Sequence, residues 1–309
     1  MNRSLPRKQY GVSMAVVLWF VAAMAILVAT MVSHARMDVK RVQLHQSQVQ
    51  AEAIAHGATI LQLNHLHDSY TRGSYRGRGV LHQQQQVADH RVEVILVPTS
   101  GLIDLNRARE PLLQAMFQYG LGLDAGQAYQ LAQRLLVWRE GEQERALQPA
   151  SASTQQRANP RFEVAEDLML IDGIKRSQFE QLRHLIHTTQ DGDSGVDWLS
   201  APSEVLAILL RGDKQSAEAV ASARRSEFAQ AGYVTEPALP SGLSQQHLSN
   251  YAANTYRIDV LVSPQENSQH RFLQRTWVQY SDQPDQRLPW KILRTEGLMV
   301  DRKSDSSSG

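Results

Sequence analysis

The pattern of hydrophobic and polar residues divides the chain into an apolar N-terminal segment and a mixed remainder. Residues 12–33 contain no charged side chain, and they follow a short leader that carries basic residues. A helix of roughly 20 apolar residues spans the hydrocarbon core of a bilayer. Apolar residues then recur at helical spacing to about residue 68 without an intervening proline. The pattern therefore predicts one continuous helix, with a transmembrane part at 12–33 and a further part at 34–68 outside the membrane.

Two other interpretations of the apolar segment remain open. A secretory signal peptide would use Ala23-Met24-Ala25 as its cleavage site, although the apolar run is longer than the roughly 7 to 15 residues usual for such peptides. An ordinary signal anchor without special processing is the second alternative. Basic residues flank the segment on both sides, so the positive-inside rule does not decide its orientation.

The remainder of the chain predicts a sheet domain that is interrupted by helices. Alternating or fully apolar runs predict strands at 90–97, 255–262, 272–280 and 290–295. The Gly-, Arg- and Gln-rich residues 69–89 indicate a loop or a twisted edge hairpin. Helical periodicity predicts helices at 107–119, 125–140, 164–171, 176–188, 202–210 and 214–230.

We therefore expect an α+β fold in which the long N-terminal helix packs on an antiparallel sheet. The sheet domain comprises residues 69–103 and 249–300, and a large all-α domain is inserted at 104–248. Residues 301–309 are polar and rich in serine, which predicts a disordered tail.

A weak internal repeat lies within the predicted insertion. Ile103-Asp104 and Ala108 align with Val196-Asp197 and Ala201, and apolar pairs follow both at the same offset. Each copy leads into a second helix that ends in charged residues, including Arg139 in one copy and Arg224 in the other. A polar residue before an apolar periodic run is typical of a helix start. The pattern predicts two related helix starts, and chance similarity is the alternative.

Composition and motifs narrow the possible chemistry. The 309 residues carry a formal net charge of +1 and contain no cysteine, which excludes disulfides, thiolate metal sites and thiol catalysis. No nucleophile elbow, zinc-protease helix or P-loop motif occurs, so we expect no enzymatic activity. His184 and His187 are three residues apart on a predicted helix, and without a third ligand they indicate a surface pair.

One loop has the composition of a cation site. Residues 191–197 alternate acids with glycines, which makes Asp191, Asp193 and Asp197 candidate ligands for a hard cation. The twelfth position of an EF-hand loop would fall on Pro202, so the loop is not an EF-hand. An ordinary polar turn is the alternative.

The N-terminus resembles that of type IV prepilins, in which a short basic leader ends in a glycine, here Gly11, before a long hydrophobic helix. The resemblance implies that a prepilin peptidase removes residues 1–11 and methylates the new terminus at Val12. The fifth mature residue is usually Glu in that family, whereas here it is Val16. A buried carboxylate needs a partner, in pilins the terminal amine of a neighbouring subunit. A subunit that lacks the carboxylate suits the top of a filament.

An interior segment makes the resemblance more specific. Residues 162–174 contain a Phe, an acidic pair, leucines and Gly-Ile, and they lie between the two predicted helix starts at 103–108 and 196–202. This arrangement resembles the minor pseudopilin K family of type II secretion, also called general secretion pathway protein K. The resemblance implies a pilin-like fold and a non-enzymatic role in which the protein caps the tip of the periplasmic pseudopilus and helps to initiate its assembly.

Further expectations follow from the same resemblance. The protein would be a single-pass inner-membrane protein with its C-terminal domain in the periplasm. Its partners would be the other minor pseudopilins, of the I, J and H types, the inner-membrane secretion platform and the prepilin peptidase. Some family members bind Ca²⁺ in the inserted domain, which makes Ca²⁺ the one candidate cofactor.

The same interior segment also resembles a helix-hairpin-helix, a unit that binds the DNA backbone, so a membrane-anchored DNA-binding or DNA-uptake protein is the alternative function. Here the hairpin is Asp172-Gly173-Ile174-Lys175, which lacks the usual second glycine. The predicted insertion also contains more acidic than basic residues, which opposes binding to phosphates. Nucleic acid is therefore not the expected partner.

Overall fold

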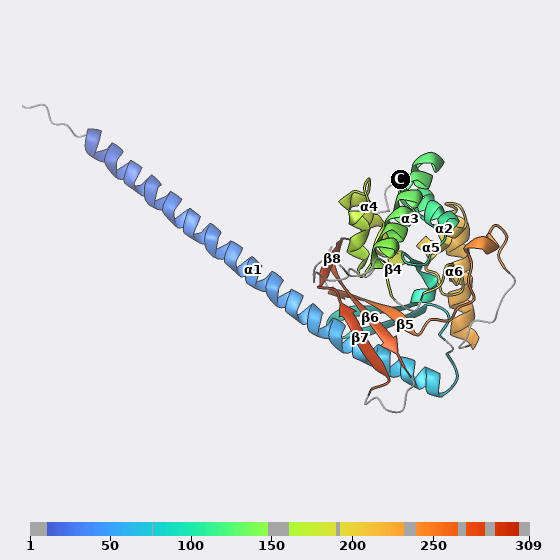
Figure 1. The fold of residues 1–309 in the computed structure, drawn as a ribbon. Coiled ribbons are helices and arrows are strands. Elements are labelled where there is room, and N and C mark those ends of the chain that lie inside the picture. The colour runs from blue at the N-terminus through green and yellow to red at the C-terminus, as the bar shows by residue number, and fades with distance from the viewer. Residues whose placement is uncertain are drawn as a thin grey trace, which may run out of the picture. The chain divides into compact units, whose positions relative to one another are not determined.

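The structure is a computed structural model, and it divides into two compact units (Figure 1). The first unit ends at Ala53 and the second begins at Ile54. The residues that the structure describes are 11–75, 77–147, 161–189, 192–231, 239–264, 270–281 and 288–302.

Helix α1 (Gly11–Thr71) is continuous, as predicted, and ends three residues beyond the predicted end at 68. Within the first unit, Met14–Met31 is long and apolar enough to cross a membrane, and its side chains are exposed. It is the one such helix among the described residues. Within the second unit, the last turns of α1 bury small and apolar side chains, including Ala58, Leu63 and Leu66. The same helix therefore has an exposed apolar part and a packed part.

The second unit contains a six-stranded antiparallel sheet with strand order β1-β2-β5-β6-β7, and β8 also pairs with β6. The strands are β1 (Leu81–Val87), β2 (His90–Pro98), β5 (Thr255–Pro264), β6 (His270–Tyr280), β7 (Trp290–Thr295) and β8 (Met299–Arg302). All four predicted strands are present. Within the range predicted as a loop or an edge hairpin, 69–89, the first three residues belong to α1, and Leu81–Val87 form the edge strand β1, which pairs with β2 in a hairpin.

The predicted start of the C-terminal tail is wrong by two residues. Asp301 and Arg302 belong to β8 and pair with Arg271 and His270 of β6. The first part of β6 is long enough to pair with β8 while its last part pairs with β7, so the chain stays in the sheet through Arg302. The rest of the predicted tail, 303–309, lies outside the described residues.

The two faces of the sheet bury different side chains, as β5 shows. Tyr256, Ile258 and Val260 are fully buried on one face. The last turns of α1 contact this face: Tyr70 stacks on Tyr280, and the Tyr70 hydroxyl bonds to that of Tyr256. Successive strand residues point to opposite faces. Consequently the intervening Arg257 and Asp259 point to the other face, which is covered by the insertion.

The chain between β2 and β5 forms the predicted helical insertion. Its helical elements are the 3-10 turn η1 (Thr99–Gly101), α2 (Glu110–Ala115), a π-helical turn η2 (Met116–Gly120), α3 (Ala125–Leu147), the 3-10 helix η3 (Ala165–Leu170), α4 (Arg176–Leu182), α5 (Ser203–Leu209), α6 (Lys214–Ala231) and the 3-10 turn η4 (Gln245–His247). Buried apolar residues from these elements form one core cluster, which includes Leu113, Phe117, Leu135 and Leu206. The α+β fold class, with its long helix, antiparallel sheet and inserted helices, is therefore confirmed.

One predicted helix is too long. Helix α4 ends at Leu182, whereas the prediction extended it to residue 188. The reason is a long-range pairing: β4 (Ile186–His187) pairs in parallel with β3 (Ile103–Asp104), and the extended backbone of this pairing is incompatible with a helix.

We predict that a methyl group at Gly77 disturbs the contact between α1 and the sheet. Gly77 has a φ of +77°, and a Cβ atom there would lie 2.8 Å from the Tyr70 hydroxyl oxygen. Gly73 has a φ of +68° but nothing within 4 Å of its Cβ position. Gly77→Ala should lower the free energy of unfolding by about 2–3 kcal/mol, and Gly73→Ala by only about 1 kcal/mol. Urea denaturation of the full chain in detergent measures both, and equal losses would contradict this role of the Tyr70 contact.

Candidate functional site

The predicted processing site lies at the beginning of α1. Gly11 is the first residue of the helix and Val12 the second, while the rest of the leader lies outside the described residues. Val16 is 59% exposed within the apolar segment. The helix therefore presents an uncharged side chain at the position where prepilins usually carry Glu. Cleavage and methylation at Gly11 and Val12 stay predictions.

The three acids of the predicted cation loop do not form a common site. Asp191 lies outside the described residues. Asp193 is exposed, and its carboxylate accepts hydrogen bonds from the Ser249 hydroxyl and the Ser194 N–H. The Ser249 hydrogen bond is the main reason that the pKa of Asp193 is lowered. Among the described residues, no group of three His, Asp or Glu side chains is arranged to hold a metal ion.

Asp197 does not fit the predicted role of a cation ligand. It is 0% exposed, and Arg78 donates to its two carboxylate oxygens at 2.7 and 3.1 Å. The Ser200 hydroxyl donates to the same carboxylate at 2.6 Å. Both oxygens are thus occupied by protein donors, and the guanidinium supplies the positive charge that a cation would bring. Calcium binding through Asp197 is therefore not supported by its surroundings.

The structure instead gives Asp197 and Asp104 the same local role. The Leu199 N–H donates to Asp197 Oδ1 at 3.2 Å, and the Asn106 N–H donates to Asp104 Oδ1 at 2.8 Å. In both cases the side chain bonds to the backbone two residues ahead, which forms an Asx turn. The predicted internal repeat is therefore a repeated turn geometry.

A buried or half-buried arginine completes each copy of the repeat. Arg139 of α3 donates to the carbonyl oxygens of Leu105 and Ala108, at 3.5 and 3.2 Å. Arg224 of α6 donates to the carbonyl oxygens one and four residues after Asp197, in the same relative positions. The two arginines therefore fasten the second helix of each copy to the turn that begins the first.

Asp104 differs from Asp197 in its charge balance. Its Oδ2 atom is buried without a hydrogen-bond partner, and it packs so closely on Gly192 that a Cβ atom there would lie 1.7 Å away. Burial raises the pKa of Asp104 to about 7, against the opposing effect of the Asn106 N–H and the Arg107 guanidinium. The sequence marked Asp104 as a helix start but gave no signal that the carboxyl group is buried.

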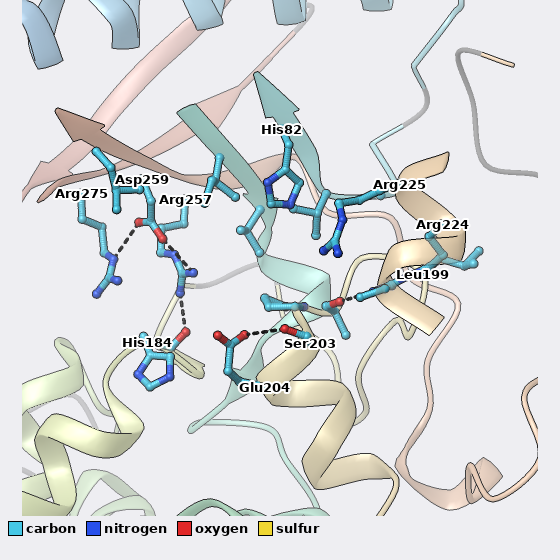
Figure 2. A pocket seen from close by; sticks show the side chains of 18 of the residues that line it. His82, His184, Leu199, Ser203, Glu204, Arg224, Arg225, Arg257, Asp259 and Arg275 are labelled. Atoms are coloured by element: carbon cyan, nitrogen blue, oxygen red, sulfur yellow. Dashed lines mark hydrogen bonds and ion pairs between the residues drawn. The ribbon is translucent and has the colours of Figure 1, made fainter. Parts of the chain in front are cut away.

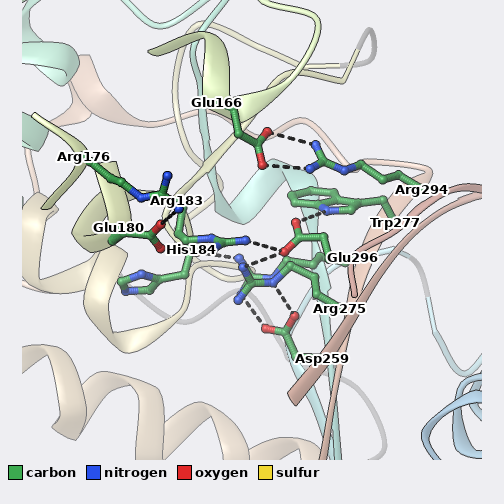
Figure 3. Close-up of polar contacts among 11 residues, drawn as sticks. Glu166, Arg176, Glu180, Arg183, His184, Asp259, Arg275, Trp277, Arg294 and Glu296 are labelled. Atoms are coloured by element: carbon green, nitrogen blue, oxygen red, sulfur yellow. Dashed lines mark hydrogen bonds and ion pairs between the residues drawn. The ribbon is translucent and has the colours of Figure 1, made fainter. Parts of the chain in front are cut away.

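The face of the sheet opposite α1 carries a buried ion network that joins it to the insertion (Figure 3). At its centre, Asp259 of β5 bonds to Arg257 at 3.0 Å and to Arg275 of β6 at 2.8 Å. Burial by itself would raise the pKa of Asp259, but the two guanidinium groups outweigh it and lower the pKa. Arg257 also donates to the backbone carbonyl of His184 in the insertion.

The network extends to two helices of the insertion. Glu296, which follows β7, accepts from Arg183 at the end of α4 at 2.7 Å and lies 3.8 Å from Arg275. Glu166 of η3 and Arg294 of β7 form a bidentate pair at 2.8 and 3.2 Å (Figure 3). The hydrogen bond from Arg294 lowers the pKa of Glu166. These pairs connect the sheet to both α4 and η3, and sequence patterns did not indicate them.

Two cavities lie beside this network. One has a volume of about 400 Å³ and is bounded by β2, β5 and β6 on one side and by α5 and α6 on the other (Figure 2). The other has a volume of about 710 Å³ and is lined by apolar side chains, including Phe162 and Trp277, together with charged ones such as Lys291. The junction of the sheet and the insertion thus has space for a ligand or a partner segment.

The predicted surface pair of histidines is wrong. His187 is only 2% exposed, because β4 carries it into the insertion, and its Nδ1 atom lies 2.8 Å from the Thr189 hydroxyl. His184 is half-buried and lines the smaller cavity, and burial lowers its pKa. The helix that would have placed both rings on one surface ends before either residue.

The turn of the proposed helix-hairpin-helix is occupied by protein groups. Gly173 has a φ of +95°, and a Cβ atom there would lie 2.5 Å from Arg134 Nη1. Arg134 donates to the Asp172 carbonyl at 3.0 Å, and the Ile174 N–H donates to the Ile171 carbonyl at 3.1 Å. The Ile174 amide is thus already used within the turn, which does not favour phosphate binding.

Comparisons with known proteins gave a match among solved structures but none among family models or curated sequences. No protein-family model matches the chain, and no curated protein matches its sequence. A chain of the crystal structure of the GspK-GspI-GspJ complex from the enterotoxigenic Escherichia coli type 2 secretion system is similar, with 13% identity and a TM-score of 0.49. The match covers 85% of this chain and 100% of that chain. A likeness of this degree does not establish a function.

We predict that Asp104 makes the stability of the fold depend on pH. The folded protein keeps a proton on Asp104 up to about pH 7, whereas the unfolded chain releases it near the ordinary value of 3.8. Stability should therefore fall as pH rises between these values, and the loss should be complete above pH 7. Asp104→Asn should raise the free energy of unfolding at pH 8 by roughly 1–3 kcal/mol and change little near pH 4.

Asp197→Asn is the matched control for this prediction, because it changes the corresponding acid in the other copy of the repeat. It should destabilise the protein at pH 8, since Arg78 then loses its carboxylate partner. Thermal unfolding of both full-chain variants in detergent and EDTA between pH 4 and pH 8 measures the difference. An Asp104→Asn variant that keeps the parent's pH dependence would refute the prediction.

Proposed function

We propose that the protein is a minor pseudopilin of the type II secretion system, which caps the tip of the periplasmic pseudopilus and helps to initiate its assembly. The observation that carries the proposal is the construction of α1. One unbroken helix joins an uncharged apolar segment, Met14–Met31, to turns that pack on an antiparallel sheet. The sheet in turn carries a helical insertion between β2 and β5. Both features agree with the resemblance found in the sequence.

The apolar segment would anchor the chain in the inner membrane, with the sheet and the insertion in the periplasm. Side chains such as Leu18, Trp19 and Phe20 are exposed along this segment. A continuous row of exposed apolar side chains needs a bilayer or neighbouring helices to cover it. In this proposal the helix bundles with helices of other pseudopilins, and the role of the protein is associative rather than catalytic.

Two features support a position at the tip. Val16 carries no charge, so it cannot bind the terminal amine of a neighbouring subunit as the usual Glu would. The insertion adds a second packed layer to the sheet, and its bulk would hinder a further subunit from packing above it. The partners we propose are the I-, J- and H-type minor pseudopilins, the inner-membrane secretion platform and a prepilin peptidase.

We predict that a prepilin peptidase cleaves the chain between Gly11 and Val12. After coexpression with such a peptidase, the intact mass should correspond to a chain that begins at Val12 and carries one added methyl group. Gly11→Val should block this cleavage, because the residue before the cut changes, whereas Gly57→Ala, in open space on the same helix, should not. A mature chain beginning at Ile26 would instead identify a signal peptide and contradict the proposal.

We also predict that the full chain copurifies with I-type and J-type minor pseudopilins and that a carboxylate at position 16 gives no advantage. Val16 and Val17 are equally exposed, at 59%. At the tip, Val16→Glu and Val17→Glu should reduce the yield of complex to the same extent, because neither carboxylate finds an amine partner. The yield is measured by affinity purification and size-exclusion chromatography in detergent.

Two results of this experiment would count against the proposal. A chain that stays monomeric beside its partners would contradict membership of the complex. A Val16→Glu variant that assembles better than the parent, while Val17→Glu does not, would contradict the position at the tip alone.

A further inference from the structure

The smaller cavity at the junction of sheet and insertion is bounded by strongly basic residues. Its volume of about 400 Å³ lies within the usual range of small-molecule sites. Its lining includes four arginines, Arg224, Arg225, Arg257 and Arg275, but only two carboxylates, those of Glu204 and Asp259 (Figure 2). The cavity wall therefore has more cationic than anionic groups.

The carboxylates around the cavity form ion pairs with some of these arginines but not with all of them. Asp259 bonds to both Arg257 and Arg275. Arg225 pairs with Glu218, outside the lining, at 2.6 Å. Glu296, also outside the lining, is shared between Arg275 and Arg183. Glu204 is exposed, and its carboxylate accepts a hydrogen bond from the Ser203 hydroxyl at 3.4 Å.

Among the described residues, no carboxylate bonds to Arg224, and burial lowers its pKa against the nearby charges of Asp197 and Glu218. Arg224 is 8% exposed, and its terminal nitrogens donate to the backbone carbonyls of Trp198 and Ala201. Its Nε atom is buried without a partner, and so is the Nε atom of Arg257 on the opposite wall. A buried guanidinium without a carboxylate is costly, and an anion within the cavity would offset that cost.

The cavity has a basic floor and a mixed rim. Arg257, Arg275 and Arg224 are buried, whereas Arg225 and Glu204 are exposed. In Figure 2 the Arg225 guanidinium, from α6, points toward the side of the cavity that carries Ser203 and Glu204 of α5. An anion that entered would thus approach Arg225 favourably and Glu204 unfavourably, and the single acid of the rim disfavours ligands of high negative charge.

We propose that this cavity binds a small oxyanion, a carboxylate or phosphate group that carries a single negative charge. The ligand would contact β5 and β6 of the sheet together with α6 of the insertion, so its binding would strengthen the attachment of the insertion to the sheet. This role is independent of the proposed function in secretion. The group could belong to a free small molecule or to the C-terminus of a peptide, which share the same chemistry.

The test uses the full chain in detergent at constant ionic strength, with acetate, inorganic phosphate and a short peptide with a free or an amidated C-terminus as probes. Calorimetry and thermal unfolding should show saturable binding with a dissociation constant below about 10 mM and a raised melting temperature. Binding of the free peptide but not of the amidated one would identify a chain terminus as the source. Binding of acetate or phosphate alone would identify a free anion.

Two variants at the rim should change the affinity in opposite directions. Arg225→Gln should weaken binding about tenfold by removing a charge-assisted hydrogen bond. Glu204→Gln should strengthen it by about three- to tenfold by removing a repelling charge. Both residues are exposed, so neither change should prevent folding.

Arg176→Gln is the matched control. Its side chain is 82% exposed, and it pairs with Glu180 outside the cavity lining. Absence of saturable binding by every probe would overturn the proposal. So would equal effects of Arg225→Gln and Arg176→Gln, because binding would then depend on general surface charge. None of these results alters the N-terminal mass or the copurification that test the proposed function.

Discussion

The arrangement of the second unit depends on the buried carboxylate of Asp259. A strand that is apolar on both faces could be covered by any apolar layer, but β5 alternates Ile258 and Val260 with Arg257 and Asp259. A buried Asp is tolerated only when it is paired, and here Arg257 of the same strand and Arg275 of the neighbouring strand β6 pair with it. This alternation gives the sheet one apolar face for α1 and one polar face, from which Arg257 donates to the His184 carbonyl of the insertion.

The polar face fixes where the insertion is attached more than how strongly it is attached. Buried ion pairs contribute little net stability because desolvation opposes them, but a broken pair leaves a costly unpaired charge. Arg183 of the insertion meets Glu296 of the sheet domain in a largely buried pair, and Glu166 of the insertion meets Arg294 in a more exposed one. A different placement of the insertion would separate these partners. The network therefore selects one arrangement, while the apolar core of the insertion supplies most of its stability.

Local patterns were sufficient for the parts of the fold that local periodicity determines. The apolar run and its helical continuation predicted α1, and alternating apolar residues predicted β2, β5, β6 and β7. Strand β1, with the sequence LHQQQQV, has little apolar alternation and could be assigned only as one of two alternatives. The end of α4 and the burial of Asp197 depend on partners far away in the sequence. Arg78, for example, is 119 residues from Asp197, so composition suggested a cation loop where a guanidinium is the actual partner.

The two copies of the Asp turn have the same local geometry but bond to different parts of the fold. Asp104 bonds within the insertion, and its second oxygen has no donor, which is why burial raises its pKa. Asp197 receives Arg78 from the loop between α1 and β1, and its own N–H donates to the Ser100 carbonyl just after β2. The second copy is thus tied to the sheet domain by both its side chain and its backbone. The turn geometry is the same in both copies. The difference in charge balance therefore comes from the residues that contact each turn, such as Arg78, and not from the motif itself. Because of these contacts, the second copy joins the insertion to the segments around α1 and β2.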